Sequence, residues 1–288
     1  MSSARQSTRL GGALALLALL RTTTVAAQQP PCAQTRTAPP QLCSIADRLT
    51  RIVQSDSSPA AAVAVVQHGR IVWERGFGQI DRANHVPATP ASIFFLASVS
   101  KSITAVAVMH LAEQRRLDLD APVSRYFEPG LQTVHTGSPD SVTARALLQM
   151  TAGVPHVVRF AWADDIEPPP TEAELVRKFG FVAFAAGRHF DYSNMSFGVL
   201  QHLVTRASGR PYGTYLADEV FRPFGMLHTT TRVTEALKPY EAKVYARGSS
   251  AALPLLALQP DAGAGLHSSA HDLALLALRL LDSPTPVL

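Results

Sequence analysis

Apolar and polar positions near the start of the chain predict a helix followed by a β-hairpin. With Ser44 as the helix cap, four apolar side chains fall on one helical face: Ile45, Leu49, Ile52 and Val53. Two short, largely apolar segments follow, Ala61–Gln67 and Ile71–Phe77, with a turn at His68-Gly69 between them. We expect these two segments to pair as strands.

The remaining apolar pattern is mainly helical. An extended segment, Ile93–Ala97, leads into a helix from Ser98 that is apolar almost all round, which is typical of a buried helix. A second helix begins at Asn194 and ends at Gly209, and a third covers Ala270–Leu281. Residues 120–230 are mainly helical with Pro-rich loops. Without an internal repeat or an independent second domain, the pattern predicts one α/β domain.

The first 27 residues have the pattern of a secretory signal peptide. Two arginines precede the apolar run Leu10–Leu20, and Val25-Ala26-Ala27 supplies small residues at a cleavage site. The apolar run is too short to span a bilayer. We therefore expect an exported chain, periplasmic or secreted, with no stable membrane span after cleavage.

Charge and cysteine content change this picture in two ways. Cleavage of residues 1–27 removes three arginines and no acidic residue, which lowers the formal net charge from +4 to +1. Because basic residues form no run, we expect no nucleic-acid partner. A Pro-rich leader (28–44) holds both cysteines, Cys32 and Cys43, which can form a disulfide in an exported compartment; two free thiols are the alternative.

Ser98 and Lys101 carry candidate chemistry because they lie three residues apart at a predicted helix start. Residues i and i+3 share a helical face, so the serine hydroxyl and the lysine amine can meet. A desolvated lysine can take the proton of a neighbouring serine and make it a nucleophile. Only four lysines occur in the chain, and arginine cannot act as a base. The alternative is a helix cap followed by a surface lysine.

Tyr192 and Asn194 form a second candidate pair, on a loop at the entrance of the later helix. A phenol held near a lysine can relay a proton. A side-chain amide can hold both the lysine and a substrate carbonyl. The alternative is an ordinary turn before a helix.

Four segments together resemble the serine β-lactamase-related hydrolases, which include class C β-lactamases, D-alanyl-D-alanine carboxypeptidases and esterases of the same fold. They are Ile93–Phe127, Ala146–His156, Phe190–Met226 and Ala262–Leu281, and the resemblance covers residues 45–288 in unbroken motif order. It implies an α/β (α+β) fold of the β-lactamase/transpeptidase type. In that fold an antiparallel sheet is flanked by helices and joined to a mainly helical region.

The resemblance also implies a role for each candidate residue. Ser98 is the acyl-accepting nucleophile, whose backbone N–H forms half of the oxyanion hole, and Lys101 is its base or base partner. Tyr192 relays protons to the leaving group, and Asn194 orients Lys101 and binds the substrate. The substrate is a small molecule or peptide with a β-lactam, D-amino-acid peptide or ester carbonyl. No cofactor is implied.

The third motif of that group, K-T-G or H-x-G on a late strand, has no counterpart after Tyr192. His135-Thr136-Gly137 fits H-x-G but precedes Tyr192, and we interpret it as coincidence. The group's late strands pair with the early hairpin and supply a second oxyanion donor, whose loss typically costs about a hundredfold to a thousandfold in turnover. We therefore expect a truncated hydrolase that lacks its late strands and whose activity is in doubt. The alternatives are a noncatalytic ligand-binding homologue and an inactive fragment.

Other constellations do not indicate a metal or a nucleotide. His267 and His271 are four residues apart but lack the glutamate of an H-E-x-x-H site, and Ser268 or Ser269 between them is a helix cap. The glycines near residue 264 do not complete a dinucleotide fingerprint. We expect no metal site.

Overall fold

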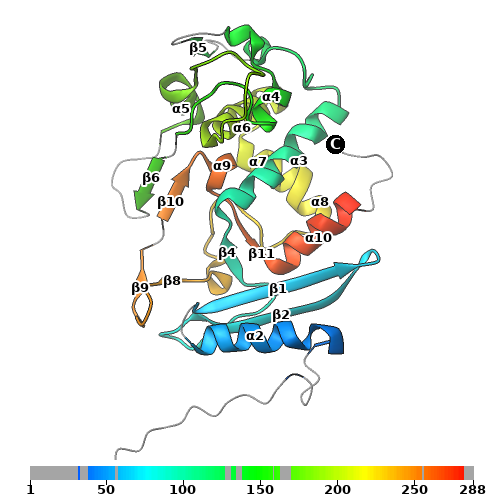
Figure 1. Cartoon of the computed structure of the whole chain (residues 1–288), viewed down its shortest axis with the longest axis vertical. Helices are drawn as coiled ribbons and strands as arrows, with labels where there is room; N and C mark the ends of the chain where they lie inside the picture. The colour runs from blue at the N-terminus through cyan, green and yellow to red at the C-terminus, as the bar shows by residue number, and fades with distance from the viewer. Residues whose placement is uncertain are drawn as a thin grey trace, which may run out of the picture.

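The structure is a computed structural model that describes residues 32, 38–55, 58–126, 131–133, 138–157, 159–162, 170–254 and 256–281. The predicted signal peptide (1–27) lies outside these residues. Figure 1 shows two parts, a lower one formed by a hairpin and two helices and an upper one that is mainly helical. Short strands lie between them.

A three-stranded antiparallel sheet with the order β1-β2-β3 forms the lower part. β1 (Ala60–Gln67) and β2 (Arg70–Asp81) confirm the predicted hairpin, and β2 continues beyond the predicted end. His68 and Gly69 have positive φ angles of 50° and 70°, as a tight turn between twisted strands requires. The short β3 (Val86–Pro87) pairs with β2, which leaves β1 at an edge of the sheet within the described residues.

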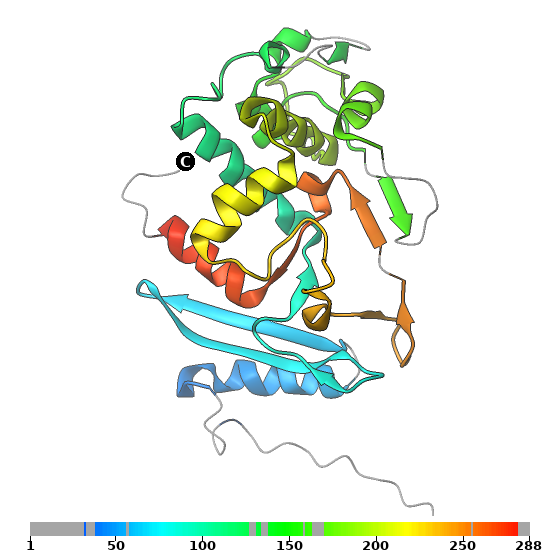
Figure 2. The same cartoon turned by 180° about the vertical axis from the view of Figure 1, so that it is seen from behind.

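Helices cover both faces of the hairpin (Figures 1 and 2). α2 (Cys43–Gln54) packs on one face, where Ala46, Trp73 and Phe77 belong to a small buried cluster. α10 (Ala270–Leu281) packs on the other face. The two helices thus remove apolar side chains on both sides of the hairpin from water.

The start of α2 shows that the predicted cap at Ser44 is wrong. A 3-10 turn, η1 (Pro40–Leu42), runs directly into α2, and Leu42 occupies the N-cap position without a side-chain cap. The turn itself satisfies early backbone N–H groups, because the N–H of Cys43 donates to Pro40 O. A serine cap is therefore not needed, and Ser44 lies inside the helix.

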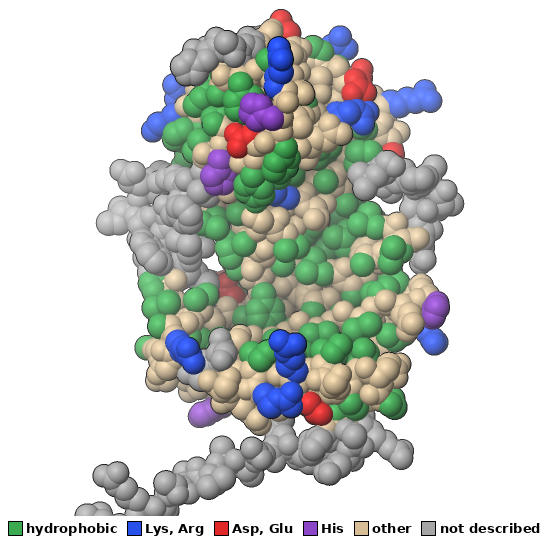
Figure 3. Space-filling view, viewed as in Figure 1, with side chains coloured by type: hydrophobic (Ala, Val, Ile, Leu, Met, Phe, Trp, Pro, Cys, Tyr) green, Lys and Arg blue, Asp and Glu red, His purple; other side chains and the backbone are tan. Residues whose placement is uncertain are grey.

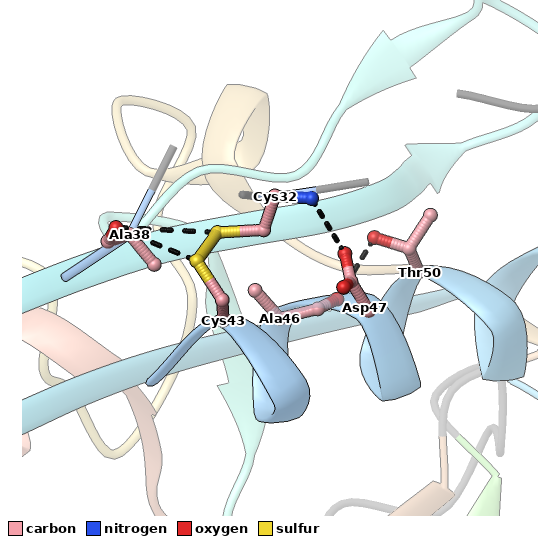
Figure 4. The surroundings of a disulfide bond; sticks show 6 residues. All are labelled: Cys32, Ala38, Cys43, Ala46, Asp47 and Thr50. Carbon is pink, nitrogen blue, oxygen red and sulfur yellow. Dashed lines mark hydrogen bonds between the residues drawn. A yellow bond between two sulfur atoms is a disulfide. The ribbon is translucent and has the colours of Figure 1, made fainter. Parts of the chain in front are cut away.

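Cys32 and Cys43 form a disulfide bond, the first of the two predicted alternatives (Figure 4). Cys43 is the first residue of α2, and Cys32 is buried in the cluster between α2 and β2. The backbone N–H of Cys32 donates to Oδ1 of Asp47 at 2.8 Å. The predicted leader (28–44) therefore does not precede the folded domain entirely, because its cysteines are part of the packing around α2.

The upper part is built around α3 (Ser100–Glu113), which follows strand β4 (Ile93–Phe95) and a 3-10 turn, η2 (Ala97–Val99). As predicted, the helix is buried, and its fully or nearly enclosed apolar residues are Ile103, Val106, Ala107, Val108 and Leu111. β4 pairs antiparallel with β11 (His267–Ser269), directly before α10. This pairing joins the segment before α3 to a late part of the chain.

Further helices and short strands complete the upper part and its main hydrophobic core. The helices are α4 (Ala144–Leu148), α5 (Glu172–Phe179), α6 (Asn194–Ser208), α7 (Tyr212–Leu216), the π-helix η5 (Ala217–Phe221), α8 (Arg222–Phe224) and α9 (Asp261–Ala264), with 3-10 turns η3 (Val123–Arg125), η4 (Pro139–Ser141) and η6 (Lys238–Tyr240). The strand pairs are β5 (Gln132–Thr133) with β7 (Phe181–Val182), β6 (Arg159–Trp162) with β10 (Leu256–Gln259), and β8 (Val244–Tyr245) with β9 (Ala252–Leu253). Helices α3, α6 and α9 contact one another in every pairing.

The surface between the two parts is apolar on the face drawn in Figure 3. Hydrophobic side chains gather across the middle of this face, where the surface is hollowed, and most charged side chains lie nearer its two ends. None of the helices in the described part of the chain combines the length and apolarity needed to cross a membrane.

Replacement of both Cys32 and Cys43 by serine is expected to lower the free energy of unfolding. The disulfide closes a loop with a sequence separation of 11, and loss of a bond of this span costs about 3 kcal/mol by restriction of the unfolded chain. Urea denaturation of the oxidised protein and of the double variant measures the difference. The reduced wild-type protein should match the double variant, and equal midpoints for all three samples would contradict the prediction.

Candidate active site

Ser98 lies where strand β4 turns into helix α3. The N–H of Leu96 donates to Leu266 O at 2.9 Å, which holds the end of β4, and Ser98 follows in the centre of η2. Ala97 has a φ of 45°, a left-handed conformation that strains an alanine backbone. The sharp turn leaves Ser98 exposed, whereas Lys101 on the first turn of α3 is buried.

The ammonium group of Lys101 is enclosed by acceptors, and the residue is only 7% exposed. Nζ donates to Ser98 Oγ at 3.3 Å, to Asn194 Oδ1 at 2.5 Å and to Gly263 O at 2.6 Å. A lysine ammonium has three N–H donors, so each donor has one acceptor. Nζ also lies 4.8 Å from the centre of the Tyr192 ring, where a cation–π attraction adds to the contacts.

The phenol of Tyr192 contacts the same serine. Its oxygen lies 2.7 Å from Ser98 Oγ, and either group can donate the proton. Partial burial opposes ionisation of the phenol, but interactions with Lys101 and Ser98 outweigh burial, so the pKa of Tyr192 is lowered from its ordinary value. A phenol with a lowered pKa gives up and recovers a proton more readily near neutral pH.

The loop that carries Tyr192 is tied to a neighbouring loop. Ser193 Oγ donates to Pro155 O at 2.9 Å, and the backbone N–H of Asn194 donates to His156 Nδ1 at 3.2 Å. The rings of His156 and Tyr192 have their centres 5.6 Å apart. These contacts fix the phenol in front of Ser98, and His156 is a supporting residue that sequence reasoning did not single out.

Helix α6 begins at Asn194 and ends before Gly209, as predicted. Ser193 is its N-cap and accepts from the N–H of Ser196 at 2.8 Å, and Gly209 has the left-handed φ of 67° that suits a helix end. The cap fixes the direction of the first helical turn. Asn194 is therefore directed at Lys101 from a rigid element, with only 7% of its surface exposed.

Gly263 is a site position that sequence reasoning missed. It contributes a backbone carbonyl, which every residue type carries, so its identity gives no direct signal. A Cβ at this position would lie 3.2 Å from Asn194 O, closer than ordinary contacts. Glycine therefore allows α9 to approach the start of α6. The need for glycine at position 263 is the signal in the sequence that could have indicated this site.

The structure brings the four predicted residues together. Ser98, Lys101 and Tyr192 form a group in which a hydroxyl lies within hydrogen-bond distance of both an ammonium and a phenol. Asn194 Oδ1 accepts a further hydrogen bond from the lysine. This arrangement can activate a serine and attack a carbonyl carbon.

The two late histidines do not lie on one helical face. His267 is on β11, and His271 is on α10, where Nδ1 lies 2.8 Å from Glu74 Oε2. Ser269 caps α10 by accepting from the N–H of Asp272 at 3.1 Å, as one of the predicted alternatives states. No group of three or more His, Cys, Asp or Glu side chains suited to a metal ion occurs in the part of the chain that the structure describes.

The model of the family described as Beta-lactamase matches residues 45–287. The chain belongs to the beta-lactamase family. The resemblance seen in the four sequence segments is thereby confirmed.

Curated relatives of the family are similar to most of this chain. "Putative penicillin-binding protein PbpX" of Bacillus subtilis (strain 168) is 29% identical over 227 residues, which are 76% of this chain and 54% of that protein. "Protein flp" of Staphylococcus aureus (strain MW2) is 27% identical over 201 residues, which are 67% of this chain and 39% of that protein. The chain thus spans about half the length of these relatives, or less.

A solved structure shows the fold. The octameric penicillin-binding protein homologue from Pyrococcus abyssi superposes with a TM-score of 0.68 at 23% identity, over 85% of this chain and 57% of that one. The predicted β-lactamase/transpeptidase-like fold, a mixture of helices and antiparallel sheet, is confirmed. The H-x-G match at 135–137 lies outside the described residues, and its interpretation as coincidence stays a prediction.

Asp261, the first residue of α9, makes the stability of the site dependent on pH. Burial raises the pKa of Asp261 to about 6, and the negative charge of Glu172 adds to the rise while Arg232 opposes it. The folded chain therefore holds this proton more tightly than the unfolded chain does between pH values of 3.8 and about 6. The stabilisation is present at low pH and is lost as the pH rises through this window.

The substitution Asp261→Asn is expected to remove this loss. Relative to the variant, the wild-type protein should lose about 2 kcal/mol of unfolding free energy between pH 4 and pH 6.5, because one pKa unit corresponds to about 1.4 kcal/mol and part of the loss occurs below pH 4. Denaturation curves across this range measure the effect. Glu113→Gln, at the exposed end of α3, is the control and should run parallel to wild type; a parallel curve for Asp261→Asn would refute the assignment.

Proposed function

We propose that the chain is an exported serine hydrolase that forms an acyl-enzyme at Ser98. The observation that carries the proposal is the 2.7 Å contact between Ser98 Oγ and the Tyr192 phenol, with Lys101 Nζ 3.3 Å from the same oxygen. Membership of the beta-lactamase family supports it. Ser98 is the nucleophile, Tyr192 the proton-transfer group and Lys101 the partner that stabilises the phenolate.

Acylation proceeds in two steps. The Tyr192 phenolate takes the proton of Ser98 Oγ, and the oxygen forms a bond to the carbonyl carbon of the substrate. The carbonyl oxygen becomes an oxyanion beside the backbone N–H of Ser98 at the positive end of α3. Collapse of this intermediate breaks the bond to the leaving group, which takes the proton from Tyr192.

Deacylation repeats the steps with water. A water molecule gives one proton to Tyr192 and attacks the acyl carbon, and collapse breaks the bond to Ser98 Oγ, which recovers the proton. Asn194 holds Lys101 through Oδ1 in both halves and offers its Nδ2 to a polar group of the substrate. No cofactor takes part in this scheme.

The proposed substrates are small molecules or peptides with a reactive carbonyl: a β-lactam, a D-amino-acid peptide or an ester. The name of the Bacillus subtilis relative refers to penicillin binding, which supports a β-lactam as the first compound to test. Export to the periplasm or medium is part of the proposal. It is supported by the signal-like pattern of residues 1–27 and by the Cys32–Cys43 disulfide, which suits an oxidising compartment.

Incubation of the mature chain with a penicillin and with an activated ester is expected to add one acyl group, detected by intact-mass spectrometry. The adduct should be absent in Ser98→Ala. Tyr192→Phe removes the proton-transfer group and should slow adduct formation by about a hundredfold or more.

Ser102→Ala is the matched control, because Ser102 is an exposed serine on α3, four residues after Ser98. It should be labelled at the wild-type rate. An adduct that persists in Ser98→Ala would disprove the nucleophile. Saturable binding of penicillin without any adduct, on a chain shown by circular dichroism to be folded, would favour the noncatalytic ligand-binding alternative.

A further inference from the structure

Helix α9 carries one of the acceptors of Lys101, although it is too short to be stable by itself. It contains four residues, and an isolated helix this short is unstable in water. Its Gly263 carbonyl nevertheless accepts from Lys101 Nζ at 2.6 Å. Contacts from other elements must therefore hold α9 in place.

Two buried side chains hold the backbone of Ala262, the residue before Gly263. The backbone N–H of Ala262 donates to Gln201 Oε1 at 2.9 Å, and Ala262 O accepts from Thr104 Oγ1 at 2.9 Å. Gln201 is 6% exposed on α6, and Thr104 is fully buried on α3. Ala262 is thus bonded on its N–H side by one helix and on its carbonyl side by another.

Around the Ala262 carbonyl, the donor and acceptor of each hydrogen bond can be assigned in one way only. Thr104 has a single hydroxyl proton and faces the carbonyls of Ser100 and Ala262, so it must accept from the phenol of Tyr212 at 2.7 Å. Burial raises the pKa of Tyr212, which keeps the phenol protonated as this donor role requires.

Donor and acceptor can also be assigned for the hydrogen bonds that involve the backbone N–H of Ala262. Gln201 Oε1 faces a backbone N–H, so its Nε2 is the atom that donates to Glu172 Oε1, at 3.1 Å. The amide orientation therefore follows from its two partners, since a backbone N–H only donates and a carboxylate only accepts. Gln201 links Glu172, on the first turn of α5, to α9.

Close packing supports the same contact. Asn194, Gly198 and Gln201 are spaced i, i+4 and i+7 on α6 and share one face of the helix. A Cβ at Gly198 would lie 3.0 Å from Cγ of Pro260, the residue before α9. One face of α6 therefore holds Lys101 through Asn194 and, two turns on, holds α9 through Gln201.

We propose that Gln201 is a positioning residue for acylation of Ser98. Its side chain fixes the backbone N–H of Ala262 so that the Gly263 carbonyl holds Lys101 beside the nucleophile. The expected effect on the acylation rate rests on the proposed function. The effect of Gln201 on the accessibility of Lys101 can be measured without catalysis.

The kinetic test compares rates of Ser98 labelling by a fluorophosphonate probe, followed by intact mass. Gln201→Leu leaves the Ala262 N–H without its acceptor and should label about a hundredfold more slowly, the typical result of a small misplacement of a reacting group. Leu203→Ala, a fully buried residue of the same helix, controls for lost stability and should label close to the wild-type rate at a temperature where both variants are folded. Equal rates for Gln201→Leu and wild type would overturn the proposal.

Exchange of the amide and the carboxylate between positions 201 and 172 tests whether Gln201 acts through its hydrogen bonds or only by filling space. Gln201→Glu keeps an acceptor for Ala262 but places a second carboxylate against Glu172, so it should label slowly. Adding Glu172→Gln restores a donor opposite the new carboxylate, and the double variant should return toward the wild-type rate. Glu172→Gln alone keeps an acceptor for Gln201 and should change little. A double variant as slow as Gln201→Glu would count against the proposal.

The second measurement maps lysine acetylation by mass spectrometry after brief treatment with an acetylating reagent. Lys101 should react several times faster in Gln201→Leu than in wild type, whereas the other three lysines, Lys178, Lys238 and Lys243, serve as internal references. If the wild-type protein is not labelled at Ser98 at all, the proposed function fails. The acetylation rates of Lys101 then still test whether Gln201 positions this lysine. Unchanged reactivity of Lys101 would then overturn the positioning role as well.

Discussion

The architecture of this protein depends on one buried cation. Lys101 is almost completely enclosed, and removal of an ammonium group from water costs several kcal/mol unless its donors are satisfied. Its three acceptors are a hydroxyl, a side-chain amide and a backbone carbonyl, and none of them is a carboxylate. Among these acceptors the charge is held by dipoles, whose positions must be accurate because none of the three carries an opposite charge.

This requirement explains features of the packing that are otherwise unrelated. Glycine at 263 lets α9 reach the start of α6, and Gly198 lets the next turn of α6 approach Pro260. Ser100 Oγ accepts from the N–H of Leu266 at 3.1 Å, so α3 also holds the segment that follows α9. The contacts between α3, α6 and α9 thus place two of the three acceptors, Asn194 and Gly263, beside the nitrogen atom of Lys101.

The sequence predicted those parts of the site that depend on local spacing or helix ends. Ser98 and Lys101 share a helical face, and Asn194 begins a helix, so both pairs of candidates could be recognised and were found together.

The Gly263 carbonyl was missed because backbone acceptors have no residue signature, and Gln201 because its partner Ala262 lies 61 residues away. Near the N-terminus, the cap at Ser44 was wrong because the η1 turn runs directly into α2 and starts the helix earlier. Local patterns therefore identify reactive groups, whereas the groups that position them belong to the tertiary structure.

The sequence distances inside the site have a consequence for how the protein folds. Ser98 and Tyr192 are 94 residues apart, and Lys101 and Gly263 are 162 apart. Closing loops of such length costs conformational entropy before any contact is gained, so contacts of this kind form slowly. The β1–β2 hairpin joins neighbours in sequence and has no such barrier. A collapsed chain can thus contain the hairpin and buried helices while its lysine is still without acceptors, and we expect the site to mature after compaction.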